Sequence, residues 1–186
     1  MKPSSKKQLS LVLFAVLLVI IDQVIKVLVK TNMDLGQQIF VAGEWFRLCF
    51  VENEGMAFGF KFGGAIGKVA LTIFRILLCV ALIWWIGSLA KKENTPTGVL
   101  LGLSMIAAGA FGNIIDCMFY GVIWDYAPVL FGKVVDMFYF PIIRTQNFTF
   151  FEPVFNFADS CVTVGAFYLI LFQWKFFSGA GTNQRT

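Results

Sequence analysis

The stretch VFNFADSCVTVGAFYLI, residues 154–170, decides the fold of this chain. It opens an apolar run that continues to Phe177, long enough to cross a bilayer as a helix of about 20 residues. Near its start, Asn156 and Asp159 stand three positions apart and therefore share one helical face. An ionisable side chain inside a membrane costs about 2.5–3.5 kcal/mol on insertion scales, so a function for Asp159 is the default hypothesis.

The composition indicates an integral membrane protein with a single domain over residues 1–186. The chain is 58% hydrophobic and 14% charged, whereas a soluble domain is about 25% charged. The net charge of +4 does not predict a nucleic-acid partner, because the basic residues flank apolar segments instead of forming one stripe.

The hydropathy pattern predicts four membrane-spanning helices, near residues 9–29, 68–90, 98–120 and 156–177. The first is interpreted as an uncleaved helix, because no small-residue cleavage site follows it. Lysine and arginine gather near both chain ends and in the short turn before residue 98, at Lys2, Lys6, Lys7, Lys91, Lys92, Lys175 and Arg185. This distribution places both termini in the cytoplasm and predicts that the long segments 31–67 and 121–155 face outward.

The outer segments differ from the helices in pattern. The stretch IFVAGEWFRLCFVENEGMAFGF, residues 39–60, mixes aromatic and charged residues with glycines, which predicts short strands joined by a turn. We therefore expect a small sheet on the membrane surface. The second outer segment is rich in phenylalanine over residues 137–154 and is expected to form an aromatic flap or interface anchor over the site.

Missing residue types exclude several kinds of site. The chain has no histidine, so histidine-based triads, histidine metal ligands and histidine proton shuttles are excluded. Its four cysteines are widely spaced with no CxxC motif, so neither a zinc site nor a redox pair is indicated. We expect no metal and no cofactor, and we interpret the cysteines as small apolar residues.

A short pattern, N-x-x-D, occurs twice: as Asn113 and Asp116, and again as Asn156 and Asp159. Each pair presents an amide and a carboxylate on one helical face. The predicted topology brings both pairs to the outer part of the membrane, at the depth of Asp22 and Lys26 in the first helix. Asp136, in the second outer segment, can meet them there.

Two close carboxylates suggest one specific chemistry. They do not both ionise easily, so one keeps a proton while the other can take a proton from water. This arrangement is that of aspartic peptide hydrolysis, which needs no histidine or metal. Two further interpretations stay open at this point: a purely structural polar cluster, and a small transporter that passes ions or solutes along the same carboxylates.

Structural roles are also considered for the individual polar residues. Asp22 and Lys26 are four positions apart and would form an ion pair within one helix. Asn113 and Asn156 could join helices by hydrogen bonds, and Asn156 could cap the fourth helix. Arg75 could neutralise a carboxylate or extend toward the interface.

Five motifs in order resemble lipoprotein signal peptidase, the signal peptidase II family: IDQVIK, VENEGMAFGF, GNIID, VVDMF and FNFADS. The resemblance covers nearly the whole chain. It implies a membrane all-α fold of four transmembrane helices, with a small extracytoplasmic β-sheet cradle and an outer amphipathic or aromatic segment. It also implies an aspartic endopeptidase that removes the signal peptide from diacylglyceryl-modified prolipoproteins before the lipidated cysteine.

The resemblance also assigns roles to residues of this chain. Asp136 and Asp159 would be the catalytic pair. The residues that would contact the substrate or shape the site are Asn53, Gly55, Asn113, Asp116 and Asn156, with Asp22 and Lys26 in support. We expect a monomer in the inner membrane of a bacterium, in contact with lipid, with its active site near the outer leaflet.

The chain departs from the family pattern at one position. Members commonly have arginine after the aspartate of the third helix, where this chain has Cys117; Arg75 and Arg144 are candidate replacements.

Further classes of membrane protein fit the sequence less well. A rhomboid-like protease is excluded by the lack of histidine, and a presenilin-type or prepilin-type protease by the absence of Gly-x-Gly-Asp. A non-catalytic assembly factor would tolerate loss of both Asp136 and Asp159.

Overall fold

The computed structural model describes residues 3–54, 64–141, 143–145, 148–150 and 153–178. Its helices are α1 (Pro3–Asn32), α2 (Gly64–Ala90), α3 (Thr97–Ile115), the π-helix η2 (Asp116–Tyr120), α4 (Gly121–Ile123), α5 (Phe157–Phe172) and α6 (Trp174–Phe177). Its strands are β1 (Gln38–Ala42), β2 (Phe46–Asn53), β3 (Val134–Tyr139), β4 (Ile143–Thr145), β5 (Phe148–Phe150) and β6 (Val154–Phe155).

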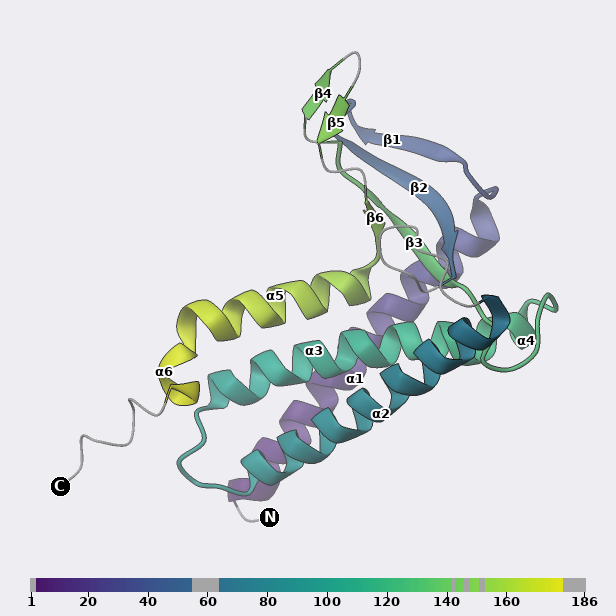
Figure 1. Cartoon of the computed structure of the whole chain (residues 1–186). Coiled ribbons are helices and arrows are strands. Elements are labelled where there is room, and N and C mark those ends of the chain that lie inside the picture. Colours follow the sequence, from purple (N-terminus) through teal and green to yellow (C-terminus); the bar gives the residue numbers. More distant parts are fainter. Residues whose placement is uncertain (1–2, 55–63, 142, 146–147, 151–152, 179–186) are drawn as a thin grey trace.

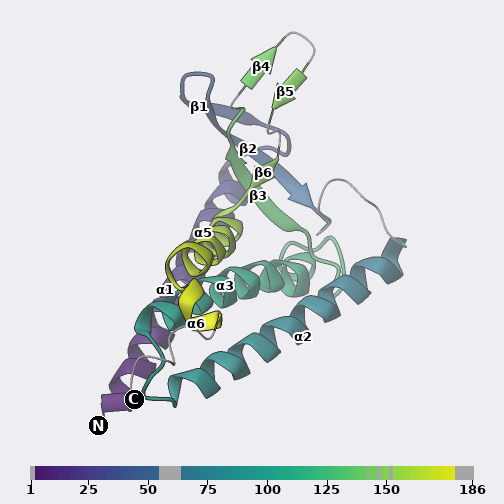
Figure 2. The same cartoon turned by 60° about the vertical axis from the view of Figure 1, so that its left-hand side comes forward.

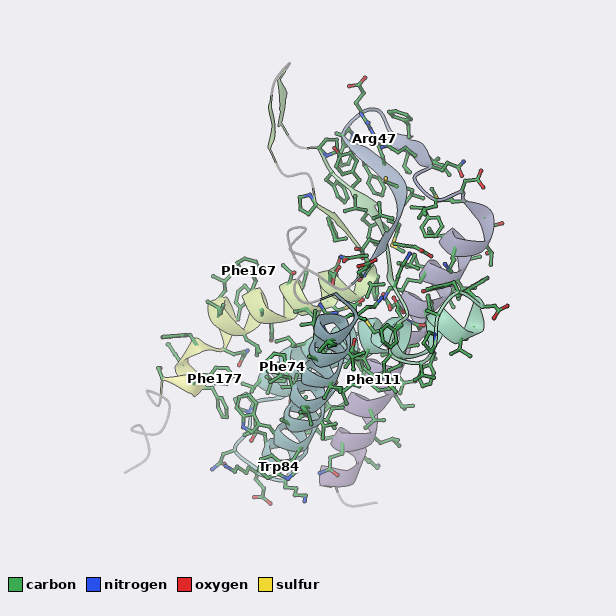
Figure 3. The ribbon with its side chains drawn as sticks, turned by 45° about the vertical axis from the view of Figure 1, so that its right-hand side comes forward. Arg47, Phe74, Trp84, Phe111, Phe167 and Phe177 are labelled. Atoms are coloured by element: carbon green, nitrogen blue, oxygen red, sulfur yellow. The ribbon has the colours of Figure 1, made fainter. Side chains whose placement is uncertain are left out.

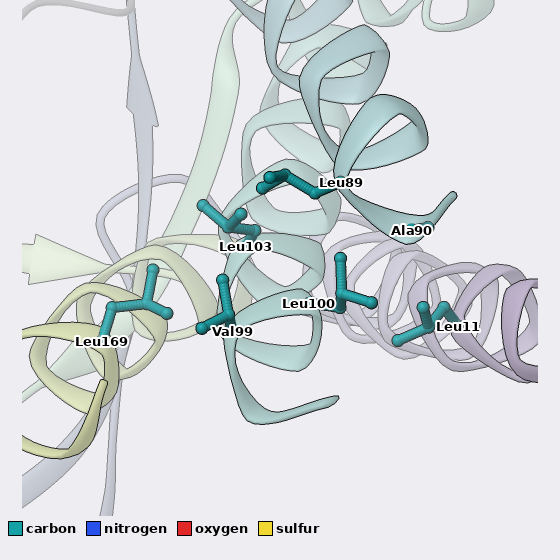
Figure 4. Close-up of a cluster of buried hydrophobic side chains, with 7 residues drawn as sticks. All are labelled: Leu11, Leu89, Ala90, Val99, Leu100, Leu103 and Leu169. Carbon is teal, nitrogen blue, oxygen red and sulfur yellow. The ribbon is translucent and has the colours of Figure 1, made fainter. Parts of the chain in front are cut away.

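The helices form a bundle with the sheet at one end (Figure 1). The start of α1, the turn between α2 and α3, and α6 lie at the opposite end (Figure 2). There Lys7 Nζ donates to the carbonyl oxygen of Thr95 at 3.0 Å, and a cluster of buried aliphatic side chains joins four helices (Figure 4): Leu11, Leu89, Ala90, Val99, Leu100, Leu103 and Leu169. The described residues of the three predicted basic regions, Lys6, Lys7, Lys91, Lys92 and Lys175, therefore lie at one end of the bundle.

Three helices are long and apolar enough to cross a membrane, over Lys6–Asn32, Gly64–Ala90 and Thr97–Ile123. Their outer surfaces carry exposed apolar side chains, and the labelled aromatic residues of the helices, such as Phe74, Trp84 and Phe167, project outward (Figure 3). Such a surface is stable in lipid and not in water. The fourth predicted span consists of α5, which is apolar and 16 residues long, followed by α6 after a break at Gln173.

The prediction of short strands joined by a turn in the first outer segment is confirmed. The four-stranded sheet has the order β1-β2-β3-β6, and each neighbouring pair is antiparallel. In its register, Val51 of β2 faces Asp136 of β3, and Phe138 of β3 faces Phe155 of β6. The pairing of β3 with β6 delivers the chain directly into α5.

The aromatic segment does not cover the site as a flap. Its strands β4 and β5 pair with each other as a separate two-stranded hairpin. In both views this hairpin extends from the far end of the sheet, away from the helices (Figures 1 and 2).

Alternation along β3 puts Val135 and Met137 on one face of the strand and Asp136 on the other. Val135 and Met137 are fully buried in a second apolar cluster with Val29, Phe50 and Tyr120. This cluster fastens the sheet to the end of α1 and to η2. Asp136, between the two packing residues, therefore points to the opposite face of the strand.

Glycines allow α3 and α5 to approach closely. A Cβ atom at Gly109 of α3 would lie 2.3 Å from the carbonyl oxygen of Ala158 in α5, and one at Gly165 of α5 would lie 2.8 Å from the carbonyl oxygen of Gly102. Small residues at helix contacts are typical of membrane bundles. This approach places the first turn of α5 beside the last turns of α3.

We expect Gly109→Ala to lower the thermal unfolding temperature of the protein in detergent. Overpacking a close contact costs about 1–3 kcal/mol, which exceeds the gain of about 1 kcal/mol in helix propensity. Gly87→Ala in α2 is the matched control, since a Cβ atom there meets nothing within 4 Å. Equal stability of the two variants would show that the contact at Gly109 is not close enough to matter.

Candidate functional site

Asp136 lies on β3 with 2% of its surface exposed. Two amide groups hold its carboxylate: Asn53 Nδ2 donates to Oδ2 at 3.1 Å, and Asn156 Nδ2 donates to Oδ1 at 2.7 Å. Asn53 comes from the adjacent strand β2, whereas Asn156 comes from the junction between β6 and α5. The carboxylate is therefore oriented from two sides by neutral donors.

Asp159 lies in the first turn of α5, where Asn156 is the N-cap residue. The Asn156 side chain accepts from the Asp159 backbone N–H at 2.9 Å, and Asp159 Oδ2 accepts from the Asn156 backbone N–H at 3.3 Å. This reciprocal pair is a capping box, so the structure confirms the prediction that Asn156 caps this helix. Asn156 thus contacts both Asp136 and Asp159.

Asn113 of α3 joins this pair to the rest of the bundle. Its Nδ2 donates to Asp159 Oδ1 at 2.8 Å. Its Oδ1 accepts from Asn156 Nδ2 at 3.1 Å and from Lys26 Nζ at 2.8 Å. The predicted hydrogen bonding by Asn113 and Asn156 between segments is therefore confirmed, and it occurs directly around the two carboxylates.

Lys26 of α1 is fully buried and lies between two carboxylates. Its Nζ is 2.9 Å from Asp22 Oδ2 and 2.8 Å from Asp116 Oδ2. The predicted ion pair within the first helix is confirmed, and it extends further than predicted: Asp22 Oδ1 accepts from the Ala158 backbone N–H at 2.9 Å, at the start of α5. One cation thereby connects α1, η2 and α5.

Two polar residues that sequence reasoning missed complete this network. Gln23 Nε2 donates to Asp116 Oδ1 at 2.9 Å and to the Gly112 carbonyl oxygen at 3.2 Å, while its Oε1 accepts from the Tyr120 hydroxyl at 3.2 Å. Gln23 could have been found, since an amide beside Asp22 in a spanning helix is unusual in itself. Tyr120 gave no such signal, because tyrosine is common at membrane interfaces.

The π-helix aims Asp116 at the sheet. Asp116 is the first residue of η2, and such wide turns are frequent at functional sites. Asp116 Oδ2 also accepts from the Val135 backbone N–H at 3.3 Å, next to Asp136. A Cβ atom at Gly132 would lie 2.0 Å from the Asp116 carbonyl oxygen, so only glycine allows the strand to begin this close to the helix.

Electrostatics separates Asp136 from an ordinary carboxyl group. Burial, followed by the nearby charge of Asp159, raises the pKa of Asp136 to about 7, although the Asn53 and Asn156 amides act in the opposite direction. Asp136 therefore binds a proton near neutral pH. An acid of this kind can donate that proton to a substrate oxygen.

The structure brings together all the predicted site residues that it describes. Eight of them share the connected network above: Asp22, Lys26, Asn53, Asn113, Asp116, Asp136, Asn156 and Asp159. Gly55 lies outside the described residues. Within the described ranges, no cluster of three or more histidine, cysteine or acidic residues could hold a metal ion, and all four cysteines are buried with free thiols.

The position of Cys117 is also informative. Arg75 Nη1 of α2 lies 3.9 Å from the Cys117 Sγ atom. A guanidinium group therefore reaches the side of η2 next to Asp116, from a different helix. The side chain of Arg144, the other candidate, lies outside the described part of the chain.

We expect Lys26→Met to lower stability strongly, because it leaves Asp22 and Asp116 buried without their cation. Removing one partner of a buried ion pair costs about 3–5 kcal/mol. Thermal unfolding in detergent would measure the loss, with Lys92→Met at an exposed turn position as the matched control. Equal unfolding temperatures for the two variants would mean that Lys26 does not hold the network.

Comparison with known proteins agrees with this geometry. The sequence profile of the family described as signal peptidase (SPase) II matches residues 14–175. A lipoprotein signal peptidase of Porphyromonas gingivalis is 43% identical over 182 residues, covering 84% of this chain and 79% of that protein. One of Amoebophilus asiaticus is 39% identical, with coverage of 84% and 74%.

A solved bacterial membrane enzyme is similar in structure, with a TM-score of 0.67 and 28% identity over 95% of this chain and 93% of that one. The family profile spans most of the chain and includes the greater part of α1 and all of α2, α3 and α5. The chain therefore belongs to the signal peptidase II family.

Proposed function

We propose that this chain is an aspartic endopeptidase that removes the signal peptide from diacylglyceryl-modified prolipoproteins, cutting before the lipidated cysteine. The observation that carries the proposal is that Asp136 and Asp159 are both hydrogen-bonded to the same residue, Asn156. Family membership and the names of the relatives, lipoprotein signal peptidases, supply the substrate class.

The two carboxyl groups divide the work of hydrolysis. In this scheme Asp159 acts as the base and takes a proton from the attacking water. Asp136 is the protonated member, in keeping with its raised pKa, and donates its proton to the carbonyl oxygen of the scissile bond. The resulting hydroxide adds to the carbonyl carbon. The tetrahedral intermediate collapses when Asp159 passes the proton taken from water to the leaving amine nitrogen, while Asp136 recovers its proton from a hydroxyl of the intermediate as the C=O bond re-forms. This scheme uses no metal, cofactor or nucleophilic side chain.

The polar neighbours position the catalytic dyad, which is the pair Asp136 and Asp159. Asn53, Asn113 and Asn156 donate only through neutral amides, so they orient the carboxylates without fixing their charge. Lys26, with Asp22 and Asp116 beside it, anchors Asn113. A positioned dyad converts hydrolysis into an oriented reaction and lowers its entropic cost.

The proposed orientation places the dyad near the outer leaflet of the bacterial inner membrane. The lysines at the far end of the bundle would face the cytoplasm, and the sheet would then lie on the outer surface. In this arrangement α5 and α6 together make the fourth span, and the protein acts as a monomer.

The transporter interpretation is less well supported. Toward the cytoplasmic end, the bundle is closed by the aliphatic cluster of Leu11, Leu100 and Leu169. Among the described residues, the connected polar network lies at the sheet end of the helices. A polar pathway would need to continue through that cluster.

We expect Asp136→Asn and Asp159→Asn each to lower kcat by about 10²–10⁴-fold, the usual contribution of a general acid or base. Cleavage of a purified diacylglyceryl prolipoprotein in lipid would be followed by its mass shift on a gel. Asp34→Asn, at an exposed position near the same end of the bundle, is the matched control and should retain activity. Full activity in either dyad variant would contradict the assignment.

The pH dependence of cleavage follows from the protonated state of Asp136. Because the pKa of this acid is about 7, its proton is present below that pH and is lost as pH rises through it. We therefore expect kcat/KM to fall on the alkaline side with a midpoint near 7, while thermal unfolding shows that the fold persists. The midpoint belongs to the coupled pair. A rate that keeps rising well above neutral pH would assign the protons differently.

A further inference from the structure

A pocket of about 330 Å³ lies between α2 and α3, and one of its lining residues, Asn113, is hydrogen-bonded to Asp159. Arg75 and Asn113 line one end, Leu82 and Ile106 line the other, and Ala110 lies between them on α3. Leu78, which also lines the pocket, is 54% exposed, so the pocket meets the lipid-facing surface. Its volume is within the range of about 300–1,000 Å³ typical of small-molecule sites.

The pocket is elongated along the helices. Arg75 and Leu82 are seven residues apart on α2, and Ile106 and Asn113 are seven residues apart on α3. At a rise of about 1.5 Å per residue, each wall is about 10 Å long. The two helices are joined by a short turn and run in opposite directions (Figure 2). Arg75 and Asn113 therefore lie at the same end of the pocket.

The polar end of the pocket reaches the catalytic network. Asn113 donates to Asp159 Oδ1 at 2.8 Å, and Arg75 Nη1 lies 3.9 Å from Cys117 Sγ. An arginine within a membrane-spanning helix is costly, and such residues mark functional sites by default. The remainder of the lining is apolar.

We infer that this pocket binds one acyl chain of the substrate's diacylglyceryl group, with Arg75 donating a hydrogen bond to the ester carbonyl oxygen of that chain. The inference rests on the proposed function. The diacylglyceryl group is attached to the residue that follows the scissile bond, so its ester carbonyls lie close to the dyad. The pocket offers a donor at that depth and an apolar slot leading away from it.

The dimensions favour an acyl chain over the signal peptide. A helix is about 10–12 Å in diameter with its side chains, which is too wide for a pocket of about 330 Å³. A single apolar side chain is much shorter than two helical turns. A flexible alkyl chain with one carbonyl group at its end matches both the shape and the polarity.

The first test fills the pocket. Ala110→Leu places a larger side chain in the slot, and Ala81→Leu makes the same change at an exposed position of α2 that does not line the pocket. We expect Ala110→Leu to raise KM for a dipalmitoyl prolipoprotein about tenfold, the scale of excluded methylene contacts. A dibutyryl prolipoprotein, whose chains end before the middle of the slot, should be affected much less.

The KM values of Ala81→Leu for both substrates should equal those of the wild type. If Ala110→Leu changes KM equally for the two substrates, or for neither, the inference is overturned. That result is also the one expected if membrane phospholipid, and not the substrate, fills the pocket. Thermal unfolding of both variants separates a filled pocket from a damaged fold.

The second test removes the donor. Arg75→Gln should raise KM for the ester-linked dipalmitoyl substrate about tenfold, the scale of a hydrogen bond from a charged group. An ether-linked analogue lacks the carbonyl oxygen, so its KM should be the same for wild type and Arg75→Gln. Equal losses on ester and ether substrates would assign Arg75 to a role other than carbonyl binding.

Failure of the inference is distinguishable from failure of the proposed function. If the wild type cleaves both lipidated substrates and Asp159→Asn does not, the peptidase assignment stands whatever the pocket variants do. If the wild type cleaves neither substrate, the proposed function fails first, and the acyl-chain site fails with it.

Discussion

The buried ammonium group of Lys26 is the constraint on which the rest of the structure depends. A cation within the apolar bundle must be paired, because an isolated buried charge is very costly. Asp22 and Asp116 supply the pairing from α1 and from η2. These contacts set the relative height of α1 and α3, and the remaining Lys26 proton donor orients the Asn113 amide. The geometry of the dyad is therefore a consequence of how one charge is neutralised.

From Asn113 the network passes through amides only. Asn113 reaches Asp159, Asn156 reaches Asp136, and Asn53 closes the other side of that carboxylate. The amides separate the dyad from the Lys26 cluster, and this separation matters chemically. The carboxylates around Lys26 are neutralised, whereas those of the dyad have no cation in direct contact among the described ion pairs. Asp136 can then keep its proton near neutral pH, which an adjacent lysine would prevent.

The sheet and the pocket place two different surfaces at the same depth. The register of β2 with β3 presents Asp136 on the face opposite the apolar cluster that fastens the sheet to the helices. The pocket between α2 and α3 approaches from the lipid side and ends at Asn113. A substrate with a peptide part and a lipid part could occupy both surfaces at once, which would explain why the site lies at the junction of sheet and bundle.

The sequence by itself determined the apolar segments, the strands of the first outer segment and the polar residues of the site, because hydropathy, alternation and the cost of a charge in lipid are local properties. Only the tertiary structure decided how these residues meet. Asp22 contacts Ala158 across 136 positions, and that contact depends on the close approach at Gly109. The role of Gln23, the position of Arg75 beside Cys117 and the outward path of the aromatic hairpin likewise follow from packing between distant segments, which no local pattern encodes.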